Sequence, residues 1–166
     1  MNATIQDAVN WLAEIGIDPE DGWATAEIIK AQDTDGLYRH VILCDDIAYK
    51  IEKDDNGCNR REFDLYHLVS PETRAMMAAC IAISDCGRVL AMRRIDYTAQ
   101  DAVDDTEQAD WHTDHFTEVL RYRLQEDGFS CDEVQLLVSD NHPGNVGYNF
   151  DGEMVWIDYG QRYTYA

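Results

Sequence analysis

The chain has 166 residues and carries 33 acidic against 13 basic side chains, a formal net charge of −20. Hydrophobic residues make up 45% of it, as in ordinary globular proteins, so we expect one domain or two small lobes rather than a disordered chain. The charge disfavours direct contact with a nucleic-acid backbone and favours a basic partner.

Membrane insertion and export are also disfavoured. The longest uncharged apolar run, residues 75–84, is shorter than the about 20 residues that a spanning helix needs. The amino-terminal sequence lacks the basic and apolar pattern of a signal peptide. The five cysteines are odd in number and include no C-x-x-C pair, which indicates reduced thiols in a cytoplasmic protein rather than disulfides or a zinc site.

The first half of the chain predicts a helix followed by strands. Apolar residues at helical spacing indicate an amphipathic helix over 4–15, within an amino-terminal region 1–22. Strand-forming residues then predict an antiparallel meander, with strands over 26–30, 38–44 and 47–52. Helical spacing resumes over 60–69.

The second half predicts a mostly helical part with two hairpins. Ser70-Pro71 is typical of a helix N-cap followed by a first-turn proline, and this helix would run to about Ala79. A long helix is expected over 111–125. Strands are expected over 80–84, 89–94, 133–138, 146–148 and 154–157. The seam near Arg94 to Asp96 divides the body of the chain into parts at 23–95 and 96–166.

Polar residues gather at the ends of two strands of the last predicted hairpin. Asp140 and Asn145 lie in the loop before it, and Asp158 follows its final strand. Because a hairpin joins these strands, we expect the three side chains to lie close together. Two carboxylates and an amide are oxygen ligands suited to Mg²⁺, and a carboxylate that is not a ligand could accept a proton from a hydroxyl substrate.

Several motifs resemble the protein-kinase-like superfamily, nearest its aminoglycoside phosphotransferase and choline-kinase branch. The D-x-H-x-x-N catalytic loop and the D-[FY]-G motif are similar to Asp140-Asn141-His142-Pro143-Gly144-Asn145 and Asp158-Tyr159-Gly160. The third strand with its lysine resembles Ile47-Ala48-Tyr49-Lys50-Ile51, and helix C resembles Arg61-Glu62-Phe63. The resemblance implies an α+β, kinase-like fold with an antiparallel-sheet N-lobe, helix C and a reduced, mostly helical C-lobe.

The resemblance also implies roles in phosphoryl transfer from ATP. Lys50, held by Glu62, would contact the α- and β-phosphates. Asp140 would orient or deprotonate the acceptor hydroxyl, while Asn145 and Asp158 would hold Mg²⁺. Residues 89–95 correspond to the fifth strand and the adenine-binding hinge of the family. The resemblance implies that the backbone of Arg93, Arg94 and Ile95 would form hydrogen bonds with the edge of adenine.

Three features depart from the family pattern. A glycine-rich loop is not visible, since the expected turn reads Asp33-Thr34-Asp35-Gly36. Val138-Ser139 precedes Asp140, where the family has His-Arg or His-Gly. The chain ends six residues after Gly160, before the later helices of the larger lobe, which implies a truncated, minimal form.

Two functions remain open from the sequence. One is a minimal phosphotransferase acting on a hydroxyl of a cationic small molecule or protein. The other is an acidic kinase-like scaffold, a pseudokinase, that binds and inhibits a basic partner such as a host nucleic-acid-binding protein, a role suited to a phage-encoded chain.

The acidic segment 96–110 is where a basic partner would dock, although such a run is equally typical of a solubilising loop. The catalytic-loop strands would leave one face uncovered in a chain without the later helices. We expect either the amino-terminal helix or a homodimer to cover that face.

Overall fold

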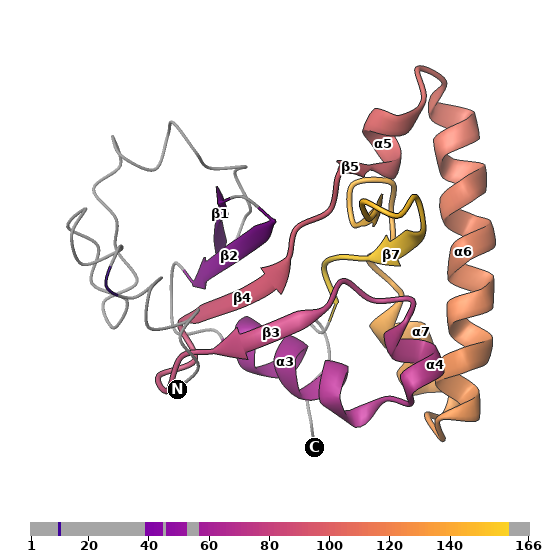
Figure 1. Ribbon diagram of the computed structural model, residues 1–166. Helices are drawn as coiled ribbons and strands as arrows, with labels where there is room; N and C mark the ends of the chain where they lie inside the picture. Colours follow the sequence, from indigo (N-terminus) through magenta and orange to yellow (C-terminus); the bar gives the residue numbers. More distant parts are fainter. Residues whose placement is uncertain (1–9, 11–38, 45, 53–56, 160–166) are drawn as a thin grey trace. The chain divides into compact units, whose positions relative to one another are not determined.

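The computed structural model describes residues 10, 39–44, 46–52 and 57–159 (Figure 1). These residues form a mixed α+β fold with antiparallel sheets, which confirms the expected fold class at that level. The chain divides into two compact units, Met1–Phe63 with Cys80–Arg94 (unit 1) and Asp64–Ala79 with Ile95–Ala166 (unit 2). The division expected from the sequence, at 1–22, 23–95 and 96–166, stays a prediction.

Several expected features lie outside the described residues. They are the strand over 26–30, the turn at 33–36, Gly160, and the amino-terminal helix over 4–15 except for Asn10, which is helical. Within the described part of the chain, no helix combines the length and the apolar character needed to cross a membrane.

Unit 1 contains a four-stranded antiparallel sheet in the order β1-β2-β4-β3. Its strands confirm four expected ones: β1 (Arg39–Cys44), β2 (Ile47–Glu52), β3 (Cys80–Ile83) and β4 (Val89–Arg93). Strand β2 lies between β1 and β4, so that Lys50 is paired with Val41 on one side and with Leu90 on the other. Gly87, at φ +78°, makes the left-handed turn that joins β3 to β4.

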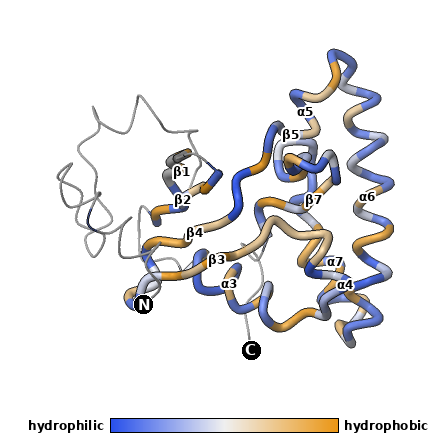
Figure 2. Tube along the Cα trace, in the orientation of Figure 1, coloured by the Kyte–Doolittle hydropathy of each residue, from blue (hydrophilic) through white to orange (hydrophobic). Residues whose placement is uncertain are grey.

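The interior of this sheet is apolar along β4 and mixed along β2. Val89, Leu90 and Ala91 are fully buried. In Figure 2 most of strand β4 has the colours of hydrophobic residues. On β2, by contrast, Lys50 and Glu52 are buried as well as the apolar Ile51. Because charged groups are seldom buried unless they are paired, the two charged residues of β2 must find partners within the unit.

Helix α3 (Cys58–Leu68) confirms the helix expected over 60–69 and begins two residues earlier. The boundary between the units falls inside it, after Phe63. Its buried positions include Asn59, Glu62 and Leu65, spaced at three residues along one face of the helix. The first two of these are polar, and they carry the contacts described below.

Helix α4 (Pro71–Arg74) has the expected N-cap but is shorter than predicted. The Ser70 hydroxyl accepts a hydrogen bond from the Thr73 N–H, and Pro71 occupies the first turn. The helix ends at Arg74 rather than near Ala79, because Met77 instead forms a parallel bridge with Trp156. The backbone on either side of Met77 bonds to Trp156, which donates to the Met76 carbonyl and accepts from the Ala78 N–H.

The acidic segment leads into a longer helix than expected. Strand β5 (Tyr97–Thr98) and the short helix α5 (Ala99–Ala102) precede α6 (Thr106–Glu126), which begins at Thr106 instead of Trp111. Asp105 is its N-cap and accepts a hydrogen bond from the Glu107 N–H at 3.0 Å. Acidic residues in a first helical turn are stabilised by the helix dipole, which explains the early start.

The strand predicted over 133–138 is wrong, because residues 133–137 belong to helix α7 (Cys131–Leu137) and Val138 is its C-cap. A capping box starts this helix: the Ser130 N–H donates to Glu133 Oε2 at 2.7 Å, and the Glu133 N–H donates to Ser130 Oγ at 3.2 Å. The backbone hydrogen bond from Ser130 lowers the pKa of the Glu133 carboxyl. The buried Val134 and Leu137 have helical rather than alternating spacing.

The last hairpin is confirmed as β6 (Val146–Tyr148) and β7 (Met154–Trp156), which form a sheet with β5 in the order β5-β6-β7. Its turn contains Gly152 at φ +81°. A Cβ at Gly147 would lie 2.8 Å from the Tyr97 carbonyl oxygen, so glycine is required where β5 and β6 approach each other. The polar segment 140–145 leads into β6, and Asp158 follows shortly after the end of β7.

Candidate functional site

A buried ion pair joins the central strand of unit 1 to α3. Lys50 Nζ lies 2.8 Å from Glu62 Oε1, and the two side chains are 9% and 0% exposed. This is the pairing that the family resemblance implies for these two residues. Because a lysine ammonium loses its hydration when it is buried, the Glu62 carboxylate supplies the compensating charge.

Arg39, on β1, is a second cation on the same carboxylate. Its Nη1 forms an ion pair with Glu62 Oε2 and donates a hydrogen bond to Asn59 Oδ1 at 3.1 Å. The sequence pattern does not single out Arg39, since an arginine at the start of a strand usually lies in solvent. Glu62 therefore holds two buried cations, and the loss of either one still leaves it a partner.

Asn59 and Glu52 complete this network around the start of α3. The Asn59 side-chain amide donates to the carbonyls of Lys50 and Arg88, at 3.0 and 2.9 Å. The Asn59 N–H donates to Glu52 Oε1 at 2.7 Å, and the Gly57 N–H to Oε2 at 3.3 Å. The Glu52 carboxylate thus caps the N-terminus of α3, where negative charge is favoured.

The unit 1 network is balanced in charge, with two cations and two anions. Arg39, Lys50, Glu52 and Glu62 are all buried. Beside them, burial raises the pKa of the Cys58 thiol, so this group stays neutral. Such a network holds the Lys50 side chain in a fixed environment on β2.

In unit 2 the loop before β6 folds around Asn145. The Asn145 side-chain amide donates to the Asp140 carbonyl at 2.9 Å and to Asp140 Oδ2 at 3.4 Å. The Asn145 N–H donates to the His142 carbonyl, and the Gly144 N–H to His142 Nδ1. Only 9% of Asn145 is exposed. Since the amide nitrogen is engaged with Asp140, the carbonyl oxygen Oδ1 is the atom of Asn145 able to bind a cation.

The β6–β7 ladder brings Asp158 to the same end of the hairpin. Val146 pairs with Trp156, and the Ile157 N–H donates to the Asn145 carbonyl at 3.0 Å, directly before Asp158. Tyr159 anchors the other side of Asp158, since its buried hydroxyl donates to the Ala78 carbonyl at 2.7 Å. The structure therefore brings Asp140 and Asn145 into contact and places the backbone before Asp158 beside Asn145, although Asp140 follows a helix and not a strand. The joint role of the three residues stays a prediction.

The donor set of this loop suits a hard cation that keeps part of its hydration. It offers the carboxylates of Asp140 and Asp158 and one amide oxygen. Among the residues with described positions, no group of three or more His, Cys, Asp and Glu side chains could hold a metal ion. Binding of Mg²⁺ by Asn145 and Asp158 stays a prediction.

The three residues expected to bind adenine differ in their contacts and do not all belong to the same unit. Arg93 closes β4 opposite Ile47, and its side chain forms an exposed ion pair with Asp46. The Arg94 N–H donates to the Asp46 carbonyl at 2.8 Å, so this donor is already used. Ile95 follows in unit 2. The adenine-binding role of this segment stays a prediction.

Comparison with known proteins gives no match: no protein-family model and no curated protein matches the chain. The kinase-like resemblance therefore depends on the motifs of the sequence, and membership of that superfamily stays a prediction.

Changing Asn145 to aspartate should destabilise the loop. The variant Asn145→Asp removes the amide donor to Asp140 and places a second carboxylate beside the Asp140 carboxylate. We expect the free energy of unfolding to fall by about 1–3 kcal/mol, because a buried acceptor loses its partner. Millimolar Mg²⁺ should recover part of the loss, since the new carboxylate can bind the cation. Urea unfolding with and without Mg²⁺ measures both effects.

Asn149→Asp is the matched control, because Asn149 lies in the β6–β7 turn and donates from its amide to Glu153 at an exposed site. We expect this variant to change the free energy of unfolding little, with no response to Mg²⁺. Equal losses in the two variants would mean that the Asn145 contacts do not support the loop.

Proposed function

We propose that the chain is a minimal, protein-kinase-like phosphotransferase that binds ATP and Mg²⁺. The observation that carries the proposal is the buried ion pair of Lys50 and Glu62, with Lys50 on the central strand and Glu62 on α3. A lysine is seldom buried without a functional or structural partner, and its ammonium is suited to the α- and β-phosphates of ATP. The motif resemblance assigns both residues to this role.

Unit 2 would supply the residues for metal and acceptor. Asn145 Oδ1 and the Asp158 carboxylate would hold Mg²⁺, which neutralises phosphate charge when bound. Asp140 would orient or deprotonate the acceptor hydroxyl, with its carboxylate held by the Asn145 amide at 3.4 Å. The backbone of Arg93, Arg94 and Ile95 would bind the adenine edge.

The acceptor in this proposal is a cationic small molecule or a basic protein. Six acidic residues of the segment 96–110 are exposed: Asp96, Asp101, Asp104, Asp105, Glu107 and Asp110. The carboxylates of Asp101 and Asp105 are engaged in local contacts with Thr98 and the start of α6. Exposed like charges of this kind attract a cation and speed its association.

A pseudokinase that binds a basic partner without phosphoryl transfer is the second candidate. It is favoured by the Arg94 N–H, which bonds to Asp46 instead of being open to adenine, and by the net charge of −20. In that case the chain would block or recruit a basic protein, such as a host nucleic-acid-binding protein, a role suited to a phage-encoded chain. The cytoplasmic location and the homodimer suggested by the sequence likewise stay predictions.

Transfer of labelled γ-phosphate separates the two candidates. We expect wild-type protein with Mg²⁺ and γ-labelled ATP to label either itself, a serine- and lysine-rich peptide or an aminoglycoside. Asp140→Asn should reduce the rate by about 10²–10⁴-fold, the usual contribution of a general base, while leaving ATP binding intact. Asp151→Asn, in the exposed β6–β7 turn, serves as the control. No transfer by wild type would contradict the enzyme and leave the pseudokinase, whereas an Asp140→Asn rate equal to wild type would contradict the role proposed for Asp140.

A further inference from the structure

One face of α6 is covered with large side chains that the described residues leave exposed. Trp111, Val119 and Tyr122 are 63%, 41% and 58% exposed, and His115 between them is exposed as well. Their spacing places all four on one side of the helix, here called the α6 stripe. The opposite side carries the buried residues Ala109, Thr113, Phe116, Thr117, Leu120 and Leu124.

The aromatic part of the α6 stripe is held in place by ring contacts. The Trp111 ring stacks on His115, with centroids 5.8 Å apart and planes within 5° of parallel. It also meets the edge of His112 at 5.0 Å. An ordered, exposed tryptophan of this kind contributes strongly to binding when a partner covers it, and tyrosine does so too.

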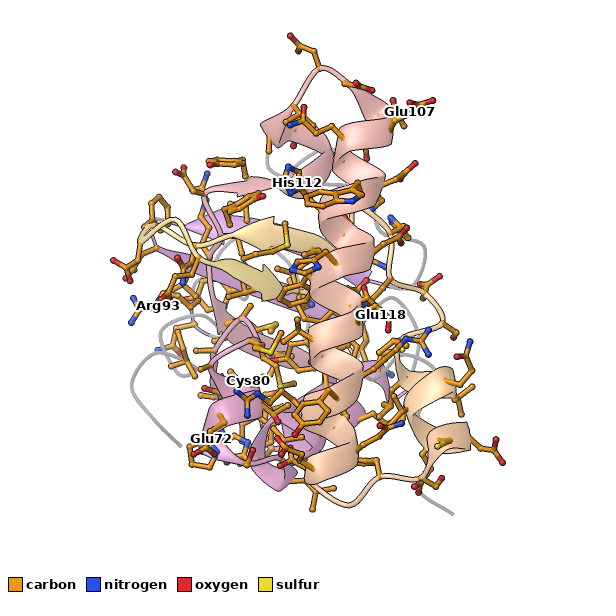
Figure 3. The ribbon with its side chains drawn as sticks, turned by 90° about the vertical axis from the view of Figure 1, so that its right-hand side faces the viewer. Glu72, Cys80, Arg93, Glu107, His112 and Glu118 are labelled. Atoms are coloured by element: carbon orange, nitrogen blue, oxygen red, sulfur yellow. The ribbon has the colours of Figure 1, made fainter. Side chains whose placement is uncertain are left out.

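Acidic side chains line one edge of the stripe. From Thr106 to Leu120 the helix contains no Lys or Arg but four acids, Glu107, Asp110, Asp114 and Glu118. Figure 3 looks onto α6, with Glu107 near one end and Glu118 near the middle. The two arginines further along are engaged: Arg121 lies 3.6 Å from Glu118, and Arg123 lies 3.2 Å from Glu126. The face is therefore apolar along the stripe and negative along one edge of it.

We propose that the α6 stripe docks a basic amphipathic helix of another protein, whose apolar residues cover Trp111 and Tyr122 and whose Lys or Arg residues meet the flanking acids. The stripe runs from residue 111 to residue 122, about 16 Å along the helix axis, which matches about three turns of a partner helix. A small molecule would instead need a concave site, and a helix face is convex.

A second copy of this chain is a poorer occupant. Each copy carries a net charge of −20, so pairing the stripes would bring together two chains of the same strong negative charge. Repulsion between like charges opposes such pairing, whereas a basic helix relieves the same charges. This proposal does not depend on nucleotide binding, and it concerns a helix face outside the candidate phosphotransfer residues.

A synthetic probe tests the docking. The probe is a fluorescent peptide about four turns long, made of leucine and lysine at amphipathic helical spacing, titrated into the full chain and followed by anisotropy. The double variant Trp111→Ala/Tyr122→Ala should bind about 30-fold more weakly, as expected for aromatic contact residues. Rising salt should weaken wild-type binding, since exposed charges are screened beyond about 10 Å at 0.1 M.

Matched controls decide whether the stripe is responsible. Phe150→Ala removes another aromatic residue of 60% exposure, outside α6, and should leave the affinity unchanged. A peptide of the same composition without helical spacing should bind more weakly. Equal binding of the two peptides, or wild-type affinity in the double variant, would overturn the proposal. It would also be overturned if sedimentation showed a wild-type dimer that the double variant dissociates, because the occupant would then be a second copy.

Discussion

Replacing Glu62 by glutamine should lower the free energy of unfolding by about 3–5 kcal/mol, the usual loss when one partner of a buried ion pair is removed. The change leaves the Lys50 ammonium and the Arg39 guanidinium buried together without their shared carboxylate. Lys50→Met should cost clearly less, because Arg39 still pairs with Glu62 and the methionine side chain fills the space of the lysine stem. Guanidinium unfolding of the two variants measures the difference.

The comparison needs a control for the loss of a negative charge from a highly acidic chain. Glu72→Gln, at an exposed position of α4, removes the same charge without touching the network and should change stability little. If Lys50→Met destabilises the protein as much as Glu62→Gln, then Arg39 does not compensate Glu62. The result would then contradict the pairing of both Arg39 and Lys50 with the Glu62 carboxylate.

Truncating Trp156 should have a similarly large effect in unit 2. Its side chain is fully buried and packs on Tyr159, with ring centroids 5.3 Å apart at 49°. Trp156→Ala should cost about 3–5 kcal/mol through lost burial and the cavity left behind. The same residue pairs with Val146 in the β6–β7 ladder. Chemical unfolding of the variant beside wild type measures the loss.

Trp156→Phe provides the conservative counterpart. The buried indole Nε1 has no hydrogen-bond partner in the described structure, so phenylalanine removes no such bond and keeps most of the aromatic packing. Its cost should stay below about 1.5 kcal/mol. Losses of equal size for alanine and phenylalanine would show that the indole packing does not hold this hairpin.

The sequence predicts the strands well because each strand and turn is specified by neighbouring residues. The strands β2 and β4 are continuous runs of strand-forming residues, and the turns between strands contain Gly87 and Gly152 at positive φ. The errors arise where another signal dominates. At α7 the capping box of Ser130 and Glu133 sets a helix in a segment whose apolar residues are equally suited to a strand.

Contacts distant in sequence account for the remaining differences. Helix α4 stops early because Met77 pairs with Trp156, 79 residues further along the chain, and no local pattern shows this. In the candidate site, Lys50 and Glu62 can be proposed from motif resemblance, whereas Arg39 cannot. Its role depends on the pairing of β1 with β2 and on the packing of α3, which only the folded structure provides.

We propose that the chain binds ATP through Mg²⁺ held at Asp158 and Asn145. Thermal unfolding with millimolar ATP tests it most directly, because a ligand of the native state stabilises it by about 2.7 kcal/mol at 100 times its Kd. We predict a higher Tm with ATP and Mg²⁺ together, no gain with ATP and a chelator, a smaller gain in Lys50→Met, and none in Asp158→Asn. A wild-type Tm that ATP and Mg²⁺ do not raise, or a gain that Asp158→Asn retains in full, would contradict the claim.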